Sequence, residues 1–185
     1  RLPGVKFYVV GSNLPAAIQA LACEDVIIIG FVENLVPLMD KMRLSVAPLR
    51  YGAGIKGKIA SAMAVGLPVV ATALAAEGMG LIDGETILIA DKPDRFAEAI
   101  GQIYNQEKLW LRFSRAGITF AEHAWGAEAG WNTLNSILQT LGLGNVPHRY
   151  PLKLYTEYRM KSNDKTTEEN HIAEGSINHK EFSIK

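Results

Sequence analysis

The sequence contains a single cysteine, few aromatic residues, no excess of either charge and no long apolar run. Because Cys23 is the only cysteine, it cannot form a disulfide within the chain, and we interpret it as a small buried apolar residue of a reducing compartment. Every apolar stretch is shorter than the ~20 residues of a membrane span, and no signal peptide is visible. The 19 basic and 19 acidic residues cancel, which gives no support for a nucleic-acid partner. We therefore expect a cytoplasmic protein without a transmembrane segment, for which peripheral membrane contact stays open.

Short apolar runs alternate with helical patterns along most of the chain. Strands of four to seven residues that alternate with helices predict βαβ units and a parallel sheet with helices on both faces, a Rossmann-like α/β fold. Asn13 and Asn34 are expected to cap the first two helices, and the third is expected to stop at Gly66. A long helical region should be interrupted near Gly117 and at residues 125–126. The expected strands are residues 5–11, 26–30, 44–49, 68–72 and 86–90.

The composition changes after residue 142. Residues 141–151 are linker-like, and residues 161–185 are polar and poor in aromatic side chains. We therefore expect residues 143–185 to form a linker and a largely flexible C-terminal tail, poorly ordered from about Ser162. Residues 1–142 should form one domain. The chain starts almost directly in a strand, which suggests a fragment of a longer protein.

The stretch "PLRYGAGIKGKIASAMAVGLPVVAT" places three glycines and two lysines between the third strand and the following helix. A glycine-rich loop at a helix start leaves backbone N–H groups unblocked, and the helix dipole adds about half a positive charge. Ligands of open parallel sheets bind beyond the carboxyl ends of the strands, where this loop lies. The loop therefore predicts an anion site.

Two general phosphate motifs fit the loop poorly. Residues 52–57 read G-x-G-x-x-G, but the next expected strand lacks the acidic residue that a dinucleotide site needs. Residues 52–58 also match the start of a P-loop, but Ile59 replaces the Ser or Thr that would bind magnesium. A P-loop site would show magnesium-dependent triphosphate binding.

A longer pattern over residues 30–79 resembles the retaining glycosyltransferases of family 4, also called group 1. The resemblance extends from residue 1 to about residue 140, and it implies the C-terminal, donor-binding half of a GT-B fold without its first strand and helix. The matching residues are Gly30, Val32, Ala47, Pro48, Leu49, Gly52, Gly54, Lys58, Ala62, Met63, Ala64, Gly66, Pro68, Val69, Val70, Thr72, Ala76, Glu77 and Gly78.

The resemblance implies that the loop holds the pyrophosphate of a nucleotide-diphosphate sugar. That pyrophosphate gains charge as the sugar leaves, so amides and an ammonium placed beside it lower the barrier. Lys58 and Glu77 are the expected catalytic residues, with Glu77 beside the donor sugar. The expected nucleotide-binding residues are Gly30, Val32, Gly52, Gly54, Ile55, Lys56, Gly57, Ser61 and Gly78.

One residue departs from the family pattern. Ser61 stands where the family usually has a Glu that binds the ribose, and Ala53 stands where many relatives have another Glu. A neutral hydroxyl binds less strongly than an ionised acceptor. A non-catalytic nucleotide- or protein-binding module is therefore the alternative to a transferase.

The resemblance implies no cofactor and no metal site, and none of the four histidines has metal-ligand spacing. The acceptor, a glycan, lipid or small molecule, would bind to an N-terminal domain that this chain lacks. We therefore expect these 185 residues to bind nucleotide weakly without transferring sugar. The sequence does not indicate the base, the sugar or the pathway.

Overall fold

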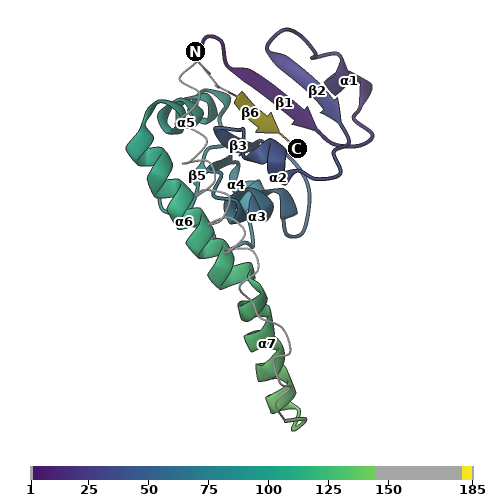
Figure 1. Ribbon diagram of the computed structural model, residues 1–185, viewed down its shortest axis with the longest axis vertical. Coiled ribbons are helices and arrows are strands. Elements are labelled where there is room, and N and C mark those ends of the chain that lie inside the picture. Colours follow the sequence, from purple (N-terminus) through teal and green to yellow (C-terminus); the bar gives the residue numbers. More distant parts are fainter. Residues whose placement is uncertain (1, 145–180, 185) are drawn as a thin grey trace, which may run out of the picture. The chain divides into compact units, whose positions relative to one another are not determined.

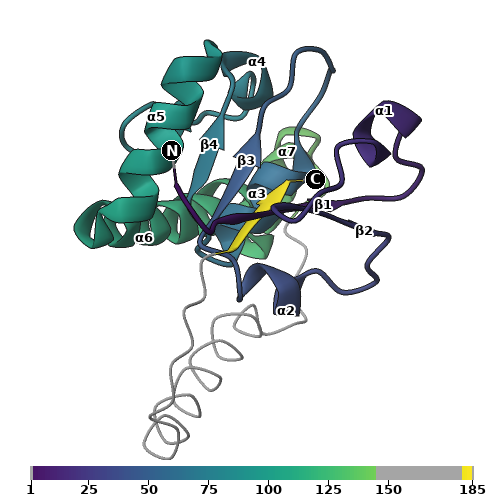
Figure 2. The ribbon, with the colours of Figure 1, turned by 90° about the horizontal axis from the view of Figure 1, so that it is seen from above.

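The computed structural model describes residues 2–144 and 181–184. Its strands form one six-stranded sheet in the order β2-β1-β6-β3-β4-β5, and all strand pairs are parallel (Figures 1 and 2). The parallel sheet expected from the alternating pattern is thus confirmed. The strands are β1 (Lys6–Val10), β2 (Val26–Gly30), β3 (Leu44–Ala47), β4 (Val69–Ala71), β5 (Leu88–Ile89) and β6 (Glu181–Ile184).

The helices are short in the first half of the chain and long in the second. They are α1 (Ala16–Gln19), α2 (Val36–Met39), α3 (Gly57–Ala64), α4 (Ala73–Ala76), α5 (Pro93–Asn105), α6 (Glu107–Trp125) and α7 (Ala127–Thr140). The described residues divide into two compact units. The first holds the sheet and the chain up to Ala121, and the second starts at Glu122 and includes α7.

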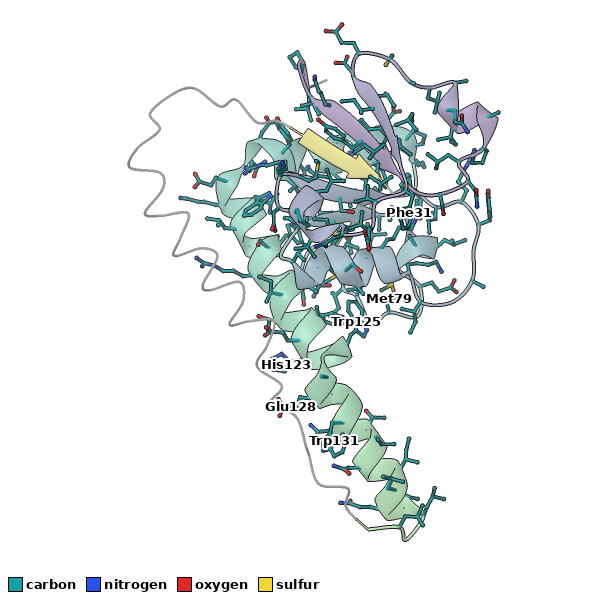
Figure 3. The ribbon with its side chains drawn as sticks, turned by 45° about the vertical axis from the view of Figure 1, so that its right-hand side comes forward. Phe31, Met79, His123, Trp125, Glu128 and Trp131 are labelled. Atoms are coloured by element: carbon teal, nitrogen blue, oxygen red, sulfur yellow. The ribbon has the colours of Figure 1, made fainter. Side chains whose placement is uncertain are left out.

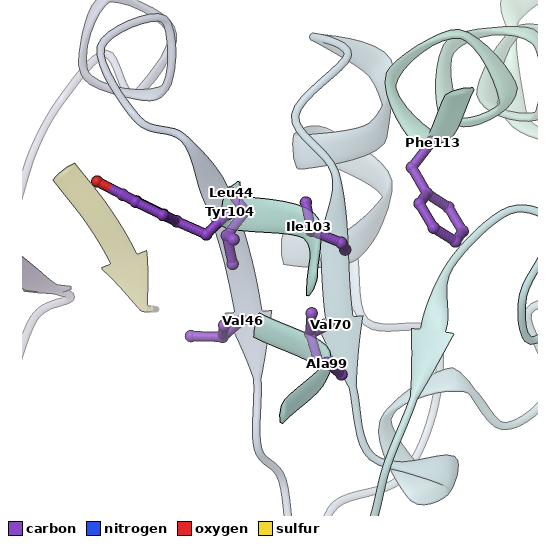
Figure 4. Close-up of a cluster of buried hydrophobic side chains, with 7 residues drawn as sticks. All are labelled: Leu44, Val46, Val70, Ala99, Ile103, Tyr104 and Phe113. Atoms are coloured by element: carbon purple, nitrogen blue, oxygen red, sulfur yellow. The ribbon is translucent and has the colours of Figure 1, made fainter. Parts of the chain in front are cut away.

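The core of the first unit lies between α5 and the central strands (Figure 4). Side chains alternate along a strand, so Leu44 and Val46 of β3 face the same side and meet Ile103 of α5. The opposite face of the sheet is covered too, since Val69 and Ala71 are buried and α3 contacts both β3 and β4. The buried cluster on the α5 side is Leu44, Val46, Val70, Ala99, Ile103, Tyr104 and Phe113.

Helix α3 ends as its sequence predicts. Gly66 has a φ of +70° and donates its amide to the Met63 oxygen at 2.8 Å. The next amide, of Leu67, donates to the Ala62 oxygen at 2.9 Å. These two bonds make a Schellman motif, which glycine favours because it adopts positive φ without steric cost.

Two helix predictions were wrong in their details. Asn13 does not cap α1: it adopts a left-handed φ of +55°, which asparagine tolerates, and Pro15 takes the N-cap position. Helix α6 runs through Gly117 without a break, because this buried glycine faces Met63 of α3. A Cβ there would lie 3.6 Å from the Met63 Cα. The predicted break at residues 125–126 is confirmed, since α6 ends at Trp125 and Gly126 is the N-cap of α7. The expected burial of Cys23 was wrong, because this residue is exposed.

The C-terminal segment contributes a strand that the sequence analysis did not expect. Strand β6 lies between β1 and β3, within a tail for which poor order was expected (Figure 1). The rest of that expectation falls on residues 145–180, outside the described residues.

Candidate functional site

The residues singled out by the sequence lie in three loops that follow β2, β3 and β4. Because the strands are parallel, all three loops leave the sheet at its carboxyl edge. This edge is where doubly wound sheets bind ligands.

The loop between β3 and α3 is shaped by glycine. Gly52 and Gly54 have φ values of +133° and +75°, which L-residues with side chains rarely adopt. Gly54 is exposed, and a Cβ built on it would meet nothing within 4 Å. Ile55 beside it is 69% exposed. The backbone of this loop is therefore open on its outer side.

The side chain of Lys56 stabilises the loop through a hydrogen bond to the loop's own backbone. Its side chain is buried, with 8% exposure, and its Nζ donates to the Gly54 carbonyl oxygen at 2.6 Å. The Lys56 Cε lies 4.0 Å from the position of a Cβ on Gly52. The Lys56 ammonium thus satisfies the Gly54 carbonyl oxygen, which would otherwise face the interior of the loop without this donor. Lys56 was predicted to bind donor directly, and the structure places its ammonium on the loop's own backbone.

The start of α3 offers backbone donors. The amides of Ile59 and Ala60 donate to the Lys56 carbonyl oxygen at 2.9 and 3.4 Å. Helix geometry gives the preceding amides, that of Gly57 among them, no acceptor within the helix. No side chain caps this end. The first turn of α3 therefore carries the positive end of the helix dipole at the carboxyl edge of the sheet.

Lys58 and Ser61 share one side of α3. Lys58 is half-buried in the first turn, and Ser61 is exposed three residues further on, a spacing that places the two side chains next to each other on a helix. The other side of the helix is anchored in the core by Ile59, Ala62 and Met63.

Thr72 ties the β3 loop to the β4 loop. Its Oγ1 donates to the Leu49 carbonyl oxygen at 2.7 Å and accepts from the Ala75 amide at 3.2 Å, as the N-cap of α4. Asp91, in the loop after β5, also holds the start of α4, because its Oδ1 accepts from the Ala73 amide at 2.9 Å. Neither residue had a predicted role of its own. A Thr between a strand and a helix is an N-cap signal that could have identified Thr72.

Glu77 and Gly78 lie at the far end of α4. Glu77 is the exposed C-cap residue of this helix, and Gly78 follows with a φ of +72°. Since Thr72 fixes the start of α4, these two residues are held in a defined position relative to the β3 loop.

The third loop begins at the last residue of β2. Gly30 has a φ of +82°, and its carbonyl oxygen accepts from the Gly11 amide at 2.8 Å. Val32 is half-buried, whereas Phe31 between them is 74% exposed (Figure 3). The Oδ1 of Asn34 accepts from the Val36 amide at 3.1 Å, which leads the chain into α2. Phe31 is an exposed aromatic side chain that the sequence analysis did not identify.

Three strand spacings separate the two ends of this site. In the sheet order, β1 and β6 lie between β2 and β3, so the Gly30 loop and the glycine loop start about 14 Å apart at ~4.8 Å per strand. A ligand that touches both loops therefore has to be extended.

The part of the chain that the structure describes has neither a cluster of metal ligands nor a membrane-spanning helix. No group of three or more His, Cys, Asp or Glu side chains is arranged to hold a metal ion. None of the described helices combines the length and the apolar character needed to cross a membrane.

Comparison with known proteins identifies the family. A family model described as "Glycosyl transferases group 1" matches residues 1–106, which include every predicted site residue. The crystal structure of TarM shares the fold, with a TM-score of 0.58 and 17% sequence identity over 76% of this chain. The chain spans 29% of the length of TarM. A search of curated protein sequences found no match. Because the matching residues make up more than half of the sequence, the chain belongs to the group 1 glycosyl transferases.

Proposed function

We propose that the chain is the donor-binding part of a retaining, family 4 type glycosyltransferase that acts in the cytoplasm. Its donor is a nucleotide-diphosphate sugar, and its acceptor is a glycan, a lipid or a small molecule bound by another part of the full-length protein. The observation that carries this proposal is the open glycine loop that leads into the uncapped start of α3 at the carboxyl edge of the sheet.

The leaving group explains why such a loop is useful. When the bond from the sugar to the diphosphate breaks, negative charge grows on the diphosphate. Backbone amides of Gly54, Ile55 and Gly57 and the ammonium of Lys58 stabilise that charge without having to reorganise. Lys56 keeps the loop in shape for this role by bonding the Gly54 carbonyl. Glu77 orients a hydroxyl of the donor sugar.

The two ends of the site are far enough apart to hold the base and the diphosphate of one nucleotide. The base binds at Gly30 and Val32 after β2, and the diphosphate binds about 14 Å away after β3, three strand spacings along the sheet. Ser61 binds the ribose between them through a single neutral hydroxyl. We therefore expect binding weaker than in relatives that have a carboxylate at this position.

Calorimetric titration of the chain with UDP, GDP and ADP tests the proposal. One of the three should bind, and the corresponding nucleoside monophosphate should bind at least tenfold more weakly, since it lacks the phosphate that the loop holds. Lys58→Ala should also lower the affinity about tenfold, because it removes a charge-assisted contact of about 1.5 kcal/mol.

Lys108→Ala is the matched control for the loss of charge. Lys108 is exposed on α6, outside the three loops, and its removal should leave affinity unchanged. Equal affinities for wild type and Lys58→Ala would place the diphosphate elsewhere.

A non-catalytic module is the second candidate, and Ser61 favours it. The side chain is exposed and carries no charge where the family pattern has a carboxylate. The absence of binding to all three diphosphates would support a protein-binding module. Nucleotide binding together with sugar transfer by the full-length protein would exclude it, and we expect no transfer from the 185-residue chain alone.

A further inference from the structure

Lys56 is a buried residue in an otherwise exposed loop. Residues 50–55 and Gly57 are all exposed, whereas Lys56 is only 8% exposed. A lysine usually extends its ammonium into water and is almost never fully buried unless its charge is paired. Among the described residues no carboxylate pairs with Lys56, and its Nζ donates to the neutral Gly54 carbonyl oxygen at 2.6 Å. An ion pair within the described part of the chain therefore does not account for the burial of this ammonium.

The bond from Lys56 sets the direction of one peptide group. The peptide between Gly54 and Ile55 is trans, so its C=O and its N–H point in opposite directions. Its C=O faces the buried ammonium of Lys56. Its N–H, which belongs to Ile55, therefore points to the side of the loop on which Gly54 and Ile55 are exposed. None of the described residues accepts a hydrogen bond from this amide, so it is presented as an open donor.

Gly54 does not fix this direction by itself. Its φ is +75°, and a Cβ built on it would meet nothing within 4 Å, so packing does not restrain it. Glycine adopts positive and negative φ about equally well, which lets the following peptide turn over. In the turned orientation the carbonyl oxygen would face the open side and repel an anion. The bond from Lys56 selects the orientation that attracts one.

We propose that Lys56 is a positioning residue of the anion site, which holds the Gly54–Ile55 peptide so that the Ile55 N–H donates to a phosphate oxygen of the ligand. A cation on the carbonyl oxygen also polarises the same peptide group and makes its N–H a stronger donor. The inference rests on the proposed function for the identity of the ligand, a nucleoside diphosphate, but its chemistry needs only the diphosphate group.

Titration with inorganic pyrophosphate, followed by NMR of the full chain labelled with ¹⁵N-isoleucine, tests the donor. The amide proton of Ile55 should move downfield and reach a plateau as it bonds to phosphate oxygen. An Ile55→Val variant assigns the signal by its loss. The amide of Ile82 is the internal control, because it already donates to the Thr86 Oγ1 at 2.9 Å and should not move.

Lys56→Met tests the positioning role, since it keeps the length of the side chain and removes the ammonium. The affinity for pyrophosphate should fall at least tenfold, and the downfield movement of the Ile55 amide should be lost. Lys108→Met removes one charge from an exposed site on α6 and should change neither. Circular dichroism checks that both variants are folded. An unchanged affinity and an unchanged Ile55 response in Lys56→Met would overturn the proposal.

A backbone substitution tests the same donor with Lys56 intact, and therefore also if Lys56→Met does not fold. Semisynthesis with the α-hydroxy acid analogue of Ile55 replaces its N–H by an ester oxygen, which should weaken pyrophosphate binding at least tenfold. The ester combined with Lys56→Met should bind about as weakly as the ester alone, because Lys56 acts through this N–H. Full affinity of the ester protein, or a combined loss equal to the product of the two single losses, would overturn the proposal.

Pyrophosphate separates this inference from the proposed function. Pyrophosphate binding that depends on Lys56, together with no binding of UDP, GDP or ADP, would reject the nucleotide donor and support the role of Lys56. Binding of a nucleoside diphosphate that Lys56→Met leaves unchanged would support the donor and overturn the role of Lys56. No response of the Ile55 amide to pyrophosphate or to any of the three nucleoside diphosphates would overturn the inference as well.

Discussion

The hydroxyl of Thr72 connects two loops that are far apart in the sequence. It donates to the Leu49 oxygen and caps α4 through the Ala75 amide. Thr72→Val keeps the shape but loses both bonds and leaves the partly buried Leu49 oxygen without this donor. We expect about 1–2 kcal/mol less stability to urea, the cost of a lost cap or a lost buried hydrogen bond.

Thr72→Ser is the control, because it keeps the hydroxyl and removes only a methyl group. It should unfold close to the wild-type urea concentration. Equal losses for the two variants would show that the methyl group, not the bridging hydroxyl, stabilises this region.

Two glycines at the edge of the site should respond in opposite directions to alanine. Gly54 has a positive φ, so Gly54→Ala should cost about 1–2 kcal/mol of stability. Gly57 lies in the first turn of α3 without a positive φ and with nothing within 4 Å of a new Cβ. Gly57→Ala should stabilise by about 0.5–1 kcal/mol. Urea unfolding measures both values, and a neutral Gly54→Ala would contradict the loop geometry.

At the scale of elements, the packing of α6 on α3 depends on Gly117. A Cβ at this position reaches the Met63 Cα at 3.6 Å, an ordinary contact distance. Gly117→Ala should therefore be tolerated, and the gain in helix propensity of up to about 1 kcal/mol makes it neutral or stabilising. Gly117→Val adds two further methyl groups against the α3 backbone and should cost about 1–3 kcal/mol. Thermal unfolding of the two variants compares them, and equal melting temperatures would argue against close contact of the helices.

Elements that depend on local signals were predictable from the sequence. Gly66 ends α3 because glycine is the residue that a Schellman motif needs, and the β-branched run at Val26–Gly30 forms a strand. Gly117 was misread for the opposite reason. A glycine inside a helical pattern indicates a break when it is judged locally, but here it allows two helices to approach, and the partner Met63 lies far away in the sequence.

In the candidate site, too, the local features were predictable from the sequence and the contacts between distant residues were not. The glycine loop and its place after β3 follow from the order of residues alone. The direction of the Lys56 side chain and the bond from Thr72 to Leu49 depend on how loops meet in three dimensions. Strand β6 was the hardest element to predict, because a four-residue strand in a polar tail carries no local signal and its partners lie more than 130 residues earlier.

At the scale of the molecule, the site belongs to one of two compact units. All three loops lie in the unit that contains the sheet, and α7 lies in the other. Ligand binding stabilises the structure that it contacts, by about 2.7 kcal/mol at a free concentration of 100 Kd. We therefore expect a bound nucleoside diphosphate to protect the two units unequally.

Hydrogen exchange measured by mass spectrometry, with and without saturating nucleoside diphosphate, tests this expectation. Amides in the loops around Gly54 and Glu77 and at the start of α3 should exchange at least tenfold more slowly in the complex, because opening them requires release of the ligand. Amides of Ala127–Thr140 in α7 should exchange at the same rate in both samples. The Lys58→Ala variant, at the same nucleotide concentration, should show smaller protection of the loops. Protection confined to α7, or spread evenly over both units, would mean that the nucleotide does not bind at the carboxyl edge of the sheet.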